Sequence, residues 1–257
     1  MIEIENLERT FPGRGDRPPT VALTDISFSV AEGEICCLLG PSGCGKSTIL
    51  NILAGFDSAT GGRALVAGKP VDKPHPSRAL VFQQPQLFPW LDVWENVTFG
   101  PRMSGMPHNQ ATERANRLLG ATGLSDFKRH RVYELSGGMR QRVAIARALI
   151  NQPEVLLMDE PFGALDAQTR ATMQQLLLSI WEDLKPTIIF VTHDVDEALF
   201  LGDQVCVMSA RPGRIRERLR VTIQRPRTLE VTTSEDFVSL KRSILGAIRA
   251  EVEASSA

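Results

Sequence analysis

Short, mainly apolar runs alternate along the chain with longer stretches in which apolar residues return every three or four positions. The runs at 35–39, 155–158 and 187–191 have the length of buried strands and are too short for core helices. Residues 167–184 show the helical spacing, with one apolar face made of Met173, Leu176, Leu177 and Ile180. This alternation predicts an α/β fold with a largely buried sheet.

The pattern changes over residues 85–152, where helical stretches with prolines and glycines replace the strand-like runs. We therefore predict an α/β core built from 1–84 and 153–222, with a helical subdomain inserted at 85–152. The remaining segment, 223–257, is predicted to be a C-terminal extension. It ends in a helix that starts near Ser234 and has one apolar stripe, formed by Phe237, Leu240, Ile244 and Ile248.

Arginines alternate with apolar residues over 214–223, which predicts a strand with one solvated face. The whole arginine-rich segment, 211–227, is read as a solvated face because the formal net charge of the 257 residues is −1. No strong positive field therefore draws the chain to nucleic acid or acidic lipid. We also see no apolar run of membrane-spanning length and no signal-peptide pattern at the N-terminus, so we expect a cytoplasmic chain that needs a partner for membrane work.

The strand at 35–39 runs into a glycine-rich loop at 40–47 with the sequence Gly-Pro-Ser-Gly-Cys-Gly-Lys-Ser, and an apolar helix follows it. Such a loop turns its backbone N–H groups toward phosphate oxygens, and the helix N-terminus adds a positive field. Lys46 supplies a charge for the outer phosphates, and Ser47 offers its hydroxyl to Mg²⁺. The predicted nucleotide contacts are Gly40, Pro41, Ser42, Gly43, Cys44, Gly45, Lys46, Ser47 and Thr48.

A second strand, 155–158, is followed by two carboxylates, Asp159 and Glu160. We predict that Asp159 binds Mg²⁺ and that Glu160 orients and polarises the attacking water. His193 ends the next buried strand, where it could contact the γ-phosphate or that water. The alternatives are an ordinary acidic pair in a loop and a structural histidine.

Ser136, Gly137 and Gly138 open another helix, and bare amides at a helix N-terminus bind anions. The alternative is a simple glycine cap. A chain with a single glycine-rich phosphate loop needs a reason for a second anion site. A nucleotide supplied by a second copy of the chain provides that reason.

Together, these motifs over about residues 1–223 resemble the nucleotide-binding subunit of an ATP-binding cassette (ABC) transporter. The resemblance implies a P-loop NTPase (RecA-like) core with the inserted helical subdomain and a small β subdomain. It makes 40–47 the Walker A loop, 155–159 Walker B and 135–141 the signature motif. It also assigns Glu160 as the general base, His193 as the switch histidine and Gln83 as a Mg²⁺-sensing residue linked to the membrane subunit.

The same resemblance implies further nucleotide contacts at Gln141, at Asp166 of the D-loop and at Phe11, which stands where the family usually has an adenine-stacking tyrosine. Phe11 could instead be a core residue. ATP and Mg²⁺ are the implied cofactors. The implied partners are a second copy of the chain, integral membrane permease subunits and, through them, a periplasmic solute-binding protein. The chain would then lie peripherally on the cytoplasmic face of the inner membrane.

Three segments, 86–91, 166–170 and 208–215, resemble the nitrate, sulfonate and taurine group of importers. Import of a small organic anion, such as an alkanesulfonate, taurine or nitrate, is therefore the expected function. Phe88, Pro89, Trp90 and Trp94 either line the docking groove for the permease or belong to the helical core, and Trp90 is the better interface candidate.

Three other functions remain open from the motifs. The chain could serve a lipid-trafficking or export system, because the ATP chemistry would be the same. It could be a soluble cassette acting on ribosomes or DNA, although it lacks a second cassette. The signature stretch and His193 weigh against the third, a kinase that shares only the phosphate loop.

Overall fold

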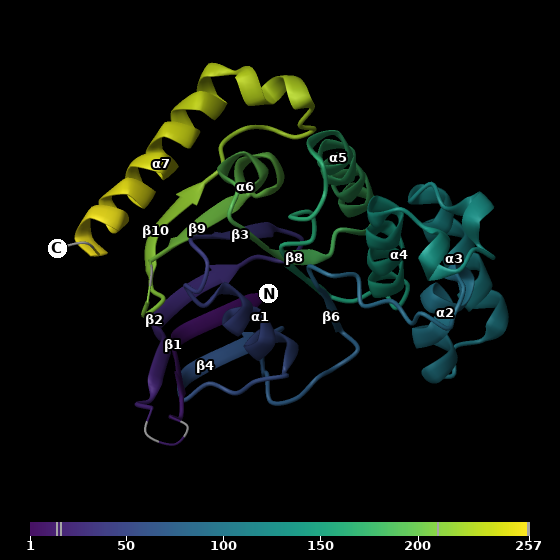
Figure 1. Cartoon of the computed structure of the whole chain (residues 1–257), viewed down its shortest axis with the longest axis horizontal. Coiled ribbons are helices and arrows are strands. Elements are labelled where there is room, and N and C mark those ends of the chain that lie inside the picture. The colour runs from purple at the N-terminus through teal and green to yellow at the C-terminus, as the bar shows by residue number, and fades with distance from the viewer. Residues whose placement is uncertain (14, 16, 210, 256–257) are drawn as a thin grey trace. The chain divides into compact units, whose positions relative to one another are not determined.

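The computed structural model describes residues 1–13, 15, 17–209 and 211–255. They form two compact units (Figure 1). The first unit takes residues 1–75 and everything from 187 onward, and the second takes 76–186. Ala210 and the last two residues, which fall in the predicted 208–215 segment and the C-terminal extension, lie outside the described residues.

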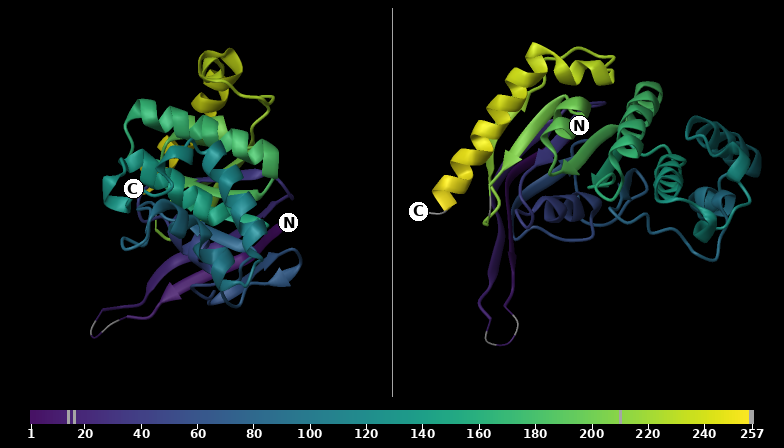
Figure 2. Two further views of the ribbon diagram at one scale, coloured as in Figure 1. Left: turned by 90° about the vertical axis from the view of Figure 1, so that its right-hand side faces the viewer. Right: turned by 45° about the horizontal axis from the view of Figure 1, so that its top comes forward.

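An antiparallel sheet in the first unit matches the expected small β subdomain. Its strands lie in the order β2 (Thr20–Val30), β1 (Ile2–Phe11), β4 (Gly61–Val66) and β5 (Lys69–Pro70). Ile2 pairs with Val30 on one side and with Val66 on the other, and all three side chains are buried. The long β1–β2 ribbon is seen from two further sides in Figure 2.

The first unit also holds the strands that position the phosphate loop. They are β3 (Ile35–Leu39), β8 (Thr187–Thr192), β9 (Gln204–Met208) and β10 (Ile215–Arg220). Parallel partners, β8 and β9, flank β3, and β10 pairs antiparallel with β9. Every residue of β3 and β8 is buried, as the predicted apolar runs require.

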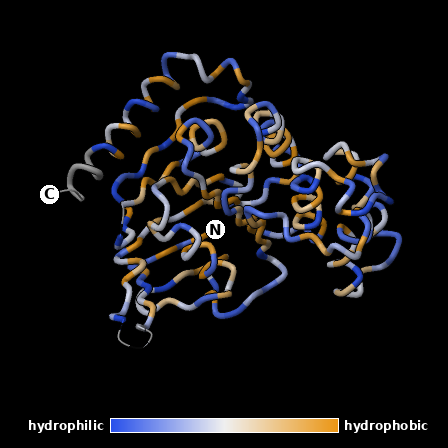
Figure 3. Tube along the Cα trace, in the orientation of Figure 1, coloured by the Kyte–Doolittle hydropathy of each residue, from blue (hydrophilic) through white to orange (hydrophobic). Residues whose placement is uncertain are grey.

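Three α-helices and a 3₁₀ turn complete the first unit. They are α1 (Lys46–Ala54), α6 (Val195–Leu201), η3 (Leu229–Thr233) and α7 (Glu235–Ser255). Gly55 ends α1 in the left-handed conformation, with φ 81°. The apolar stripe of α7 packs beside α6 with Phe237 and Ile244 buried, and Figure 3 shows its alternation with the polar side.

Arg227 contradicts the prediction that the whole segment 211–227 is solvated. Arg214, Arg216, Arg218 and Arg220 are exposed, but Arg227 is only 6% exposed. Its Nη1 donates to the carbonyl oxygens of Leu199, Phe200 and Gly202, at 3.0, 3.1 and 2.7 Å. Burial lowers the pKa of Arg227 to about 10, so it remains charged at neutral pH. The guanidinium caps the C-terminal end of α6, where free carbonyls attract a cation.

The second unit pairs two parallel strands with a group of helices. The strands are β6 (Arg78–Val81) and β7 (Val155–Asp159). The helices are α2 (Val93–Met103), α3 (His108–Ala121), α4 (Gly137–Leu149) and α5 (Ala167–Leu184), with 3₁₀ turns η1 (Ser125–Phe127) and η2 (Val132–Glu134). Helix α2 packs against both α3 and α4 (Figure 1). The predicted helix at 167–184 is confirmed.

The compact units are not divided where the predicted domains are. The prediction assigns 153–222 to the α/β core, whereas the second unit contains β7 and α5 together with the helices. The predicted domain borders at 84, 152 and 222 stay a prediction.

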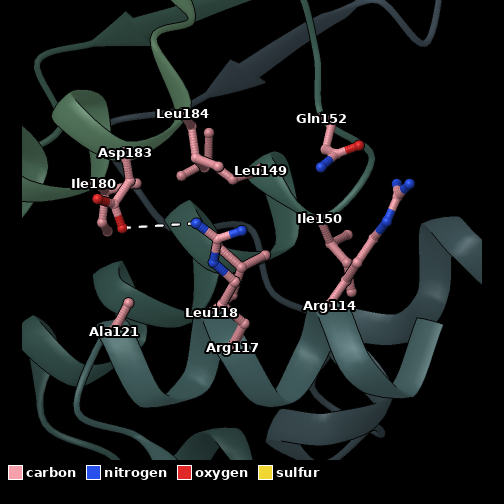
Figure 4. A pocket seen from close by; sticks show the side chains of 10 residues that line it. All are labelled: Arg114, Arg117, Leu118, Ala121, Leu149, Ile150, Gln152, Ile180, Asp183 and Leu184. Carbon is pink, nitrogen blue, oxygen red and sulfur yellow. Dashed lines mark ion pairs between the residues drawn. The ribbon is translucent and has the colours of Figure 1, made fainter. Parts of the chain in front are cut away.

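A hollow of about 50 Å³ lies inside the second unit, where α3, α5 and the end of α4 meet (Figure 4). Its lining includes the apolar residues Leu118, Leu149, Ile150, Ile180 and Leu184. Arg117 and Asp183 form an ion pair across it, with 3.7 Å between Nη2 and Oδ2. Both side chains are exposed, so this pair adds little stability.

Among the helices that the structure describes, none combines the length and the apolar character that crossing a bilayer requires.

Candidate nucleotide-binding site

The phosphate loop (residues 40–47) joins β3 to α1 in the first unit, and its glycines adopt conformations that other residues avoid. Gly43 and Gly45 have φ values of 79° and 96°, in the left-handed region. A Cβ on Gly45 would also lie 2.4 Å from Cδ2 of Leu23. Any other residue at Gly45 would be strained and would collide with β2, so the loop requires glycine there.

Lys46 is placed inside the loop rather than in solvent. Its side chain is only 5% exposed, and Nζ donates to the carbonyl oxygens of Gly40 at 2.6 Å and Pro41 at 3.0 Å. Pro41, Ser42 and Gly43 at the tip of the loop are exposed. The loop therefore presents open backbone around a fixed ammonium group, which suits a polyphosphate.

Cys44 faces inward from the loop. Its side chain is buried, and burial raises the pKa of its thiol. The other cysteines, Cys36, Cys37 and Cys206, are also buried and form no disulfide, as is usual for small core residues. Cys44 can therefore contact a nucleotide through its backbone but does not present a reactive thiolate.

Phe11 and His193 also belong to the first unit. Phe11 ends β1 and is 37% exposed, and the guanidinium carbon of Arg9 lies 4.5 Å from its ring centroid. Asp57 holds that arginine through an ion pair of 2.6 Å. The ring is therefore available at the surface rather than buried in the core. His193 follows β8 and is exposed.

The carboxylates lie in the second unit, at the C-terminal end of β7. Glu160 has a φ of 43°, an uncommon conformation for a residue with a side chain and one that concentrates at functional sites. A Cβ on Gly163 would lie 3.6 Å from Nε2 of Gln83 and 3.8 Å from Oε2 of Glu160. The structure thus brings two of the predicted catalytic side chains, Gln83 and Glu160, into one neighbourhood.

The signature segment (residues 135–141) opens α4 in the second unit. Ser136 caps the helix, and its Oγ accepts a hydrogen bond from the Met139 N–H at 3.2 Å. Ser136 and Gly137 are exposed, while Gly138 is buried against α5. A Cβ on Gly138 would lie 2.8 Å from Cγ2 of Thr169. The close approach of the two helices explains why this position is glycine.

Asp166 caps the neighbouring helix, α5, and its Oδ1 accepts from the Thr169 N–H at 3.0 Å. Hydrogen bonds from Thr169 lower the pKa of Asp166. The predicted D-loop and signature residues therefore meet around Thr169. Gln141 differs from them because it is 2% exposed, and its Nε2 has no hydrogen-bond partner among the described residues.

These residues fit ATP and Mg²⁺ chemically. The glycine loop, its lysine and the α1 N-terminus suit the phosphates, and the Ser47 hydroxyl and Asp159 carboxylate are oxygen ligands of the kind Mg²⁺ prefers. The phosphate loop, Phe11 and His193 belong to the first unit. Gln83, Asp159, Glu160, the signature segment and Asp166 belong to the second.

The sequence model of the ABC transporter family matches residues 23–163, more than half of the chain. The chain belongs to the ABC transporter family. It is therefore an ABC ATPase with the P-loop NTPase fold, and it hydrolyses ATP. Membership also excludes the kinase alternative.

Curated relatives cover almost the whole ABC ATPase. The taurine import ATP-binding protein TauB of Ruegeria pomeroyi is 46% identical over 254 residues, 96% of this chain and 93% of the relative. TauB of Yersinia pestis is 44% identical over 253 residues, 96% of this chain and 97% of the relative.

Solved structures of ABC cassettes share the fold. A dimeric cassette in a post-hydrolysis state with ADP and Pi has a TM-score of 0.75 and 31% identity, over 87% of this chain and all of that one. CbiO1 from Clostridium perfringens, part of the ABC transporter complex CbiONQ, has a TM-score of 0.78 and 30% identity over 98% of both chains.

Proposed function

We propose that the chain is the ATP-hydrolysing subunit of an importer for a small organic anion, which passes through a separate permease. Support for import comes from the relatives that are named taurine import proteins. Taurine and alkanesulfonates share a sulfonate group on a short carbon chain, and small sulfonates are the cargo class we favour. Nitrate, a smaller anion, is the other cargo in this proposal.

Two copies of the chain share each ATP in this proposal. The observation that supports shared ATP is that the chain has two separate anion-binding features. They are the phosphate loop with its lysine and the exposed N-terminus of α4 at Ser136 and Gly137. One triphosphate would bind the phosphate loop of one copy and the signature segment of the other. The solved cassette that is described as dimeric and bound to ADP and Pi supports a dimer of this chain.

The residue roles follow from their chemistry. Lys46 and the loop amides hold the phosphates, and Gln141, Asp166 and Phe11 remain proposed nucleotide contacts. Glu160 accepts a proton from the attacking water, and His193 orients that water or the γ-phosphate. Mg²⁺, held by Ser47, Asp159 and Gln83, would neutralise charge that develops on the phosphate oxygens.

The permease would dock on the second unit near Trp90. This side chain is 68% exposed and its ring centroid lies 5.6 Å from that of Phe88. Trp94 is only half-buried, with Nζ of Lys128 5.8 Å from its ring centroid. An exposed tryptophan beside a half-buried phenylalanine suits an interface. The subunit would then lie on the cytoplasmic face of the inner membrane, in reach of a periplasmic binding protein only through the permease.

The Glu160→Gln variant tests the shared site. It removes the proton acceptor but keeps the shape of the side chain, so ATP still binds while turnover falls by about a hundredfold or more. Unhydrolysed ATP should then hold two chains together, which size-exclusion chromatography with ATP would show as a dimer. Asp183→Asn, an exposed carboxylate of α5, is the matched control and should keep both turnover and the ATP-dependent elution of the wild type. Full turnover by a monomeric Glu160→Gln protein would refute the proposal.

Export and lipid trafficking remain alternatives for the same ATP chemistry, and the import relatives disfavour them. Co-purification of the tagged chain with its permease and a periplasmic binding protein would support import. Co-purification with a permease whose transport assay shows only export would overturn it.

A further inference from the structure

A tight turn connects β9 to β10 next to the phosphate loop. We call its described residues, 209 and 211–214, the brace turn. The buried Ser209 closes it, because its Oγ donates to the Pro212 carbonyl at 3.0 Å and accepts from the Arg214 N–H at 2.9 Å. These two hydrogen bonds tie Ser209 to Pro212 and to Arg214.

The brace turn is tied to β2 and packs directly on the phosphate loop. The Gly213 N–H donates to Ala22 O at 2.9 Å, and the Thr24 N–H donates to Gly213 O at 3.0 Å. A Cβ on Gly213 would lie only 2.1 Å from the carbonyl oxygen of Cys44. The two backbones are therefore in van der Waals contact, and a shift of one would move the other.

Arg211 extends from the brace turn onto the tip of the phosphate loop. Its Nη2 and Nε lie 2.9 and 3.3 Å from the position that a Cβ would occupy on Gly43. Nε also donates a long hydrogen bond to Gly43 O at 3.5 Å. The guanidinium thus covers Gly43 at the loop tip and occupies the space that a side chain at position 43 would need.

We propose that Arg211 is a positioning residue of the phosphate loop, which holds Gly43 in its left-handed conformation and adds positive charge beside the bound triphosphate. A donor on the Gly43 carbonyl polarises that peptide group, so its N–H on Cys44, which donates to Pro41 O at 3.4 Å within the loop, becomes a better donor and helps to keep the loop closed. The positive charge of the guanidinium also attracts the negatively charged phosphates at the loop. The inference rests on the proposed role of the loop in binding ATP.

The test measures ATP binding to the full chain by calorimetry, for the wild type, Arg211→Gln, Arg211→Lys and Arg214→Gln. Arg211 is exposed and its hydrogen bond is long, so Arg211→Gln should weaken binding by about threefold to fivefold at low salt. The loss should shrink at high salt, because screening removes the charge contribution from all variants. Arg211→Lys should recover at least half of the loss.

Arg214→Gln is the matched control, because it removes an exposed arginine from the same turn and keeps the backbone hydrogen bonds. It should bind ATP like the wild type, and all variants should share one unfolding midpoint. The proposal is overturned if Arg211→Gln binds like the wild type, if Arg214→Gln loses as much, or if lysine gives no rescue. The Lys46→Ala variant distinguishes failure of the proposed ATP site from failure of the role of Arg211. Full ATP affinity in Lys46→Ala would refute ATP binding by the phosphate loop. Lost affinity in Lys46→Ala, together with wild-type affinity in Arg211→Gln, would refute only the role of Arg211.

Discussion

The N-termini of two helices, α1 and α4, are suited to bind anions, and they differ in the backbone and side chains that surround them. Helix α1 begins after left-handed Gly45, and the buried side chain of its first residue, Lys46, turns back to the carbonyls of the preceding loop. Helix α4 begins at Ser136, whose Oγ is already bonded to Met139 N–H, and the Arg140 guanidinium donates to the Leu135 carbonyl. The Lys46 ammonium likewise donates to loop carbonyls, those of Gly40 and Pro41, so the two starts differ instead in the backbone before them. A glycine loop with an exposed tip precedes α1, whereas the capping Ser136 directly precedes α4. We therefore expect the second start to complete a site that the glycine loop of another copy has begun.

The largest expected effect comes from removing the cation of the first helix start. Lys46→Ala should lower ATP hydrolysis by more than about a hundredfold, because a fixed charge in a low-dielectric loop stabilises the reacting phosphates. Steady-state ATPase assays on the full chain would measure this. Lys69→Ala, which removes an exposed lysine of β5, is the control and should keep full activity. Equal activity of the two variants would remove the distinction between the helix starts.

A smaller effect on stability should distinguish the two glycines of the second helix start. Gly138→Ala places a methyl group 2.8 Å from Cγ2 of Thr169 and should destabilise the fold by about 1–2 kcal/mol. Gly137→Ala meets no described heavy atom within 4 Å and should stabilise α4 by about 0.5 kcal/mol. Urea denaturation of both variants provides the measurement.

Thr169→Ser removes the methyl group that Gly138→Ala would meet. The double variant should therefore regain most of the stability that Gly138→Ala loses, relative to Thr169→Ser alone. If Gly138→Ala destabilises the fold but Thr169→Ser restores none of the lost stability, the loss does not come from the contact between α4 and α5 at Thr169.

The smallest expected effect is the pH dependence of the Asp166 cap beside the signature segment. Its pKa is lowered by hydrogen bonds from Thr169, so the ionised form stabilises the folded state. This contribution should be present above the ordinary pKa of about 3.9 and lost as the pH falls through the lower folded value. Unfolding midpoints of the wild type and Asp166→Asn should therefore converge in acid, and a difference that is constant with pH would refute the assignment.

Much of the fold was predictable from local patterns. The apolar run at 35–39 and the helix at 167–184 appear with their predicted bounds, because burial of a whole strand or of one helix face is written into the residue order. Arg227 was not predictable, because an arginine in a charged segment is normally solvated and only the position of α6 gives it three carbonyls. The position of Arg211 over Gly43 was not predictable either, because the segment 208–215 indicated only a resemblance to the importer group.

Residue order alone determined the motifs of this ABC ATPase: a glycine loop with its lysine, a strand that ends in two carboxylates, and a helix opened by serine and two glycines. These are local features, because backbone conformation and helix polarity depend on neighbours in the chain. Tertiary structure alone decided that Gln83 lies by Glu160, that Gly138 faces Thr169 and that Arg211 covers Gly43. Such contacts join residues far apart in the chain, and packing, not local preference, selects them.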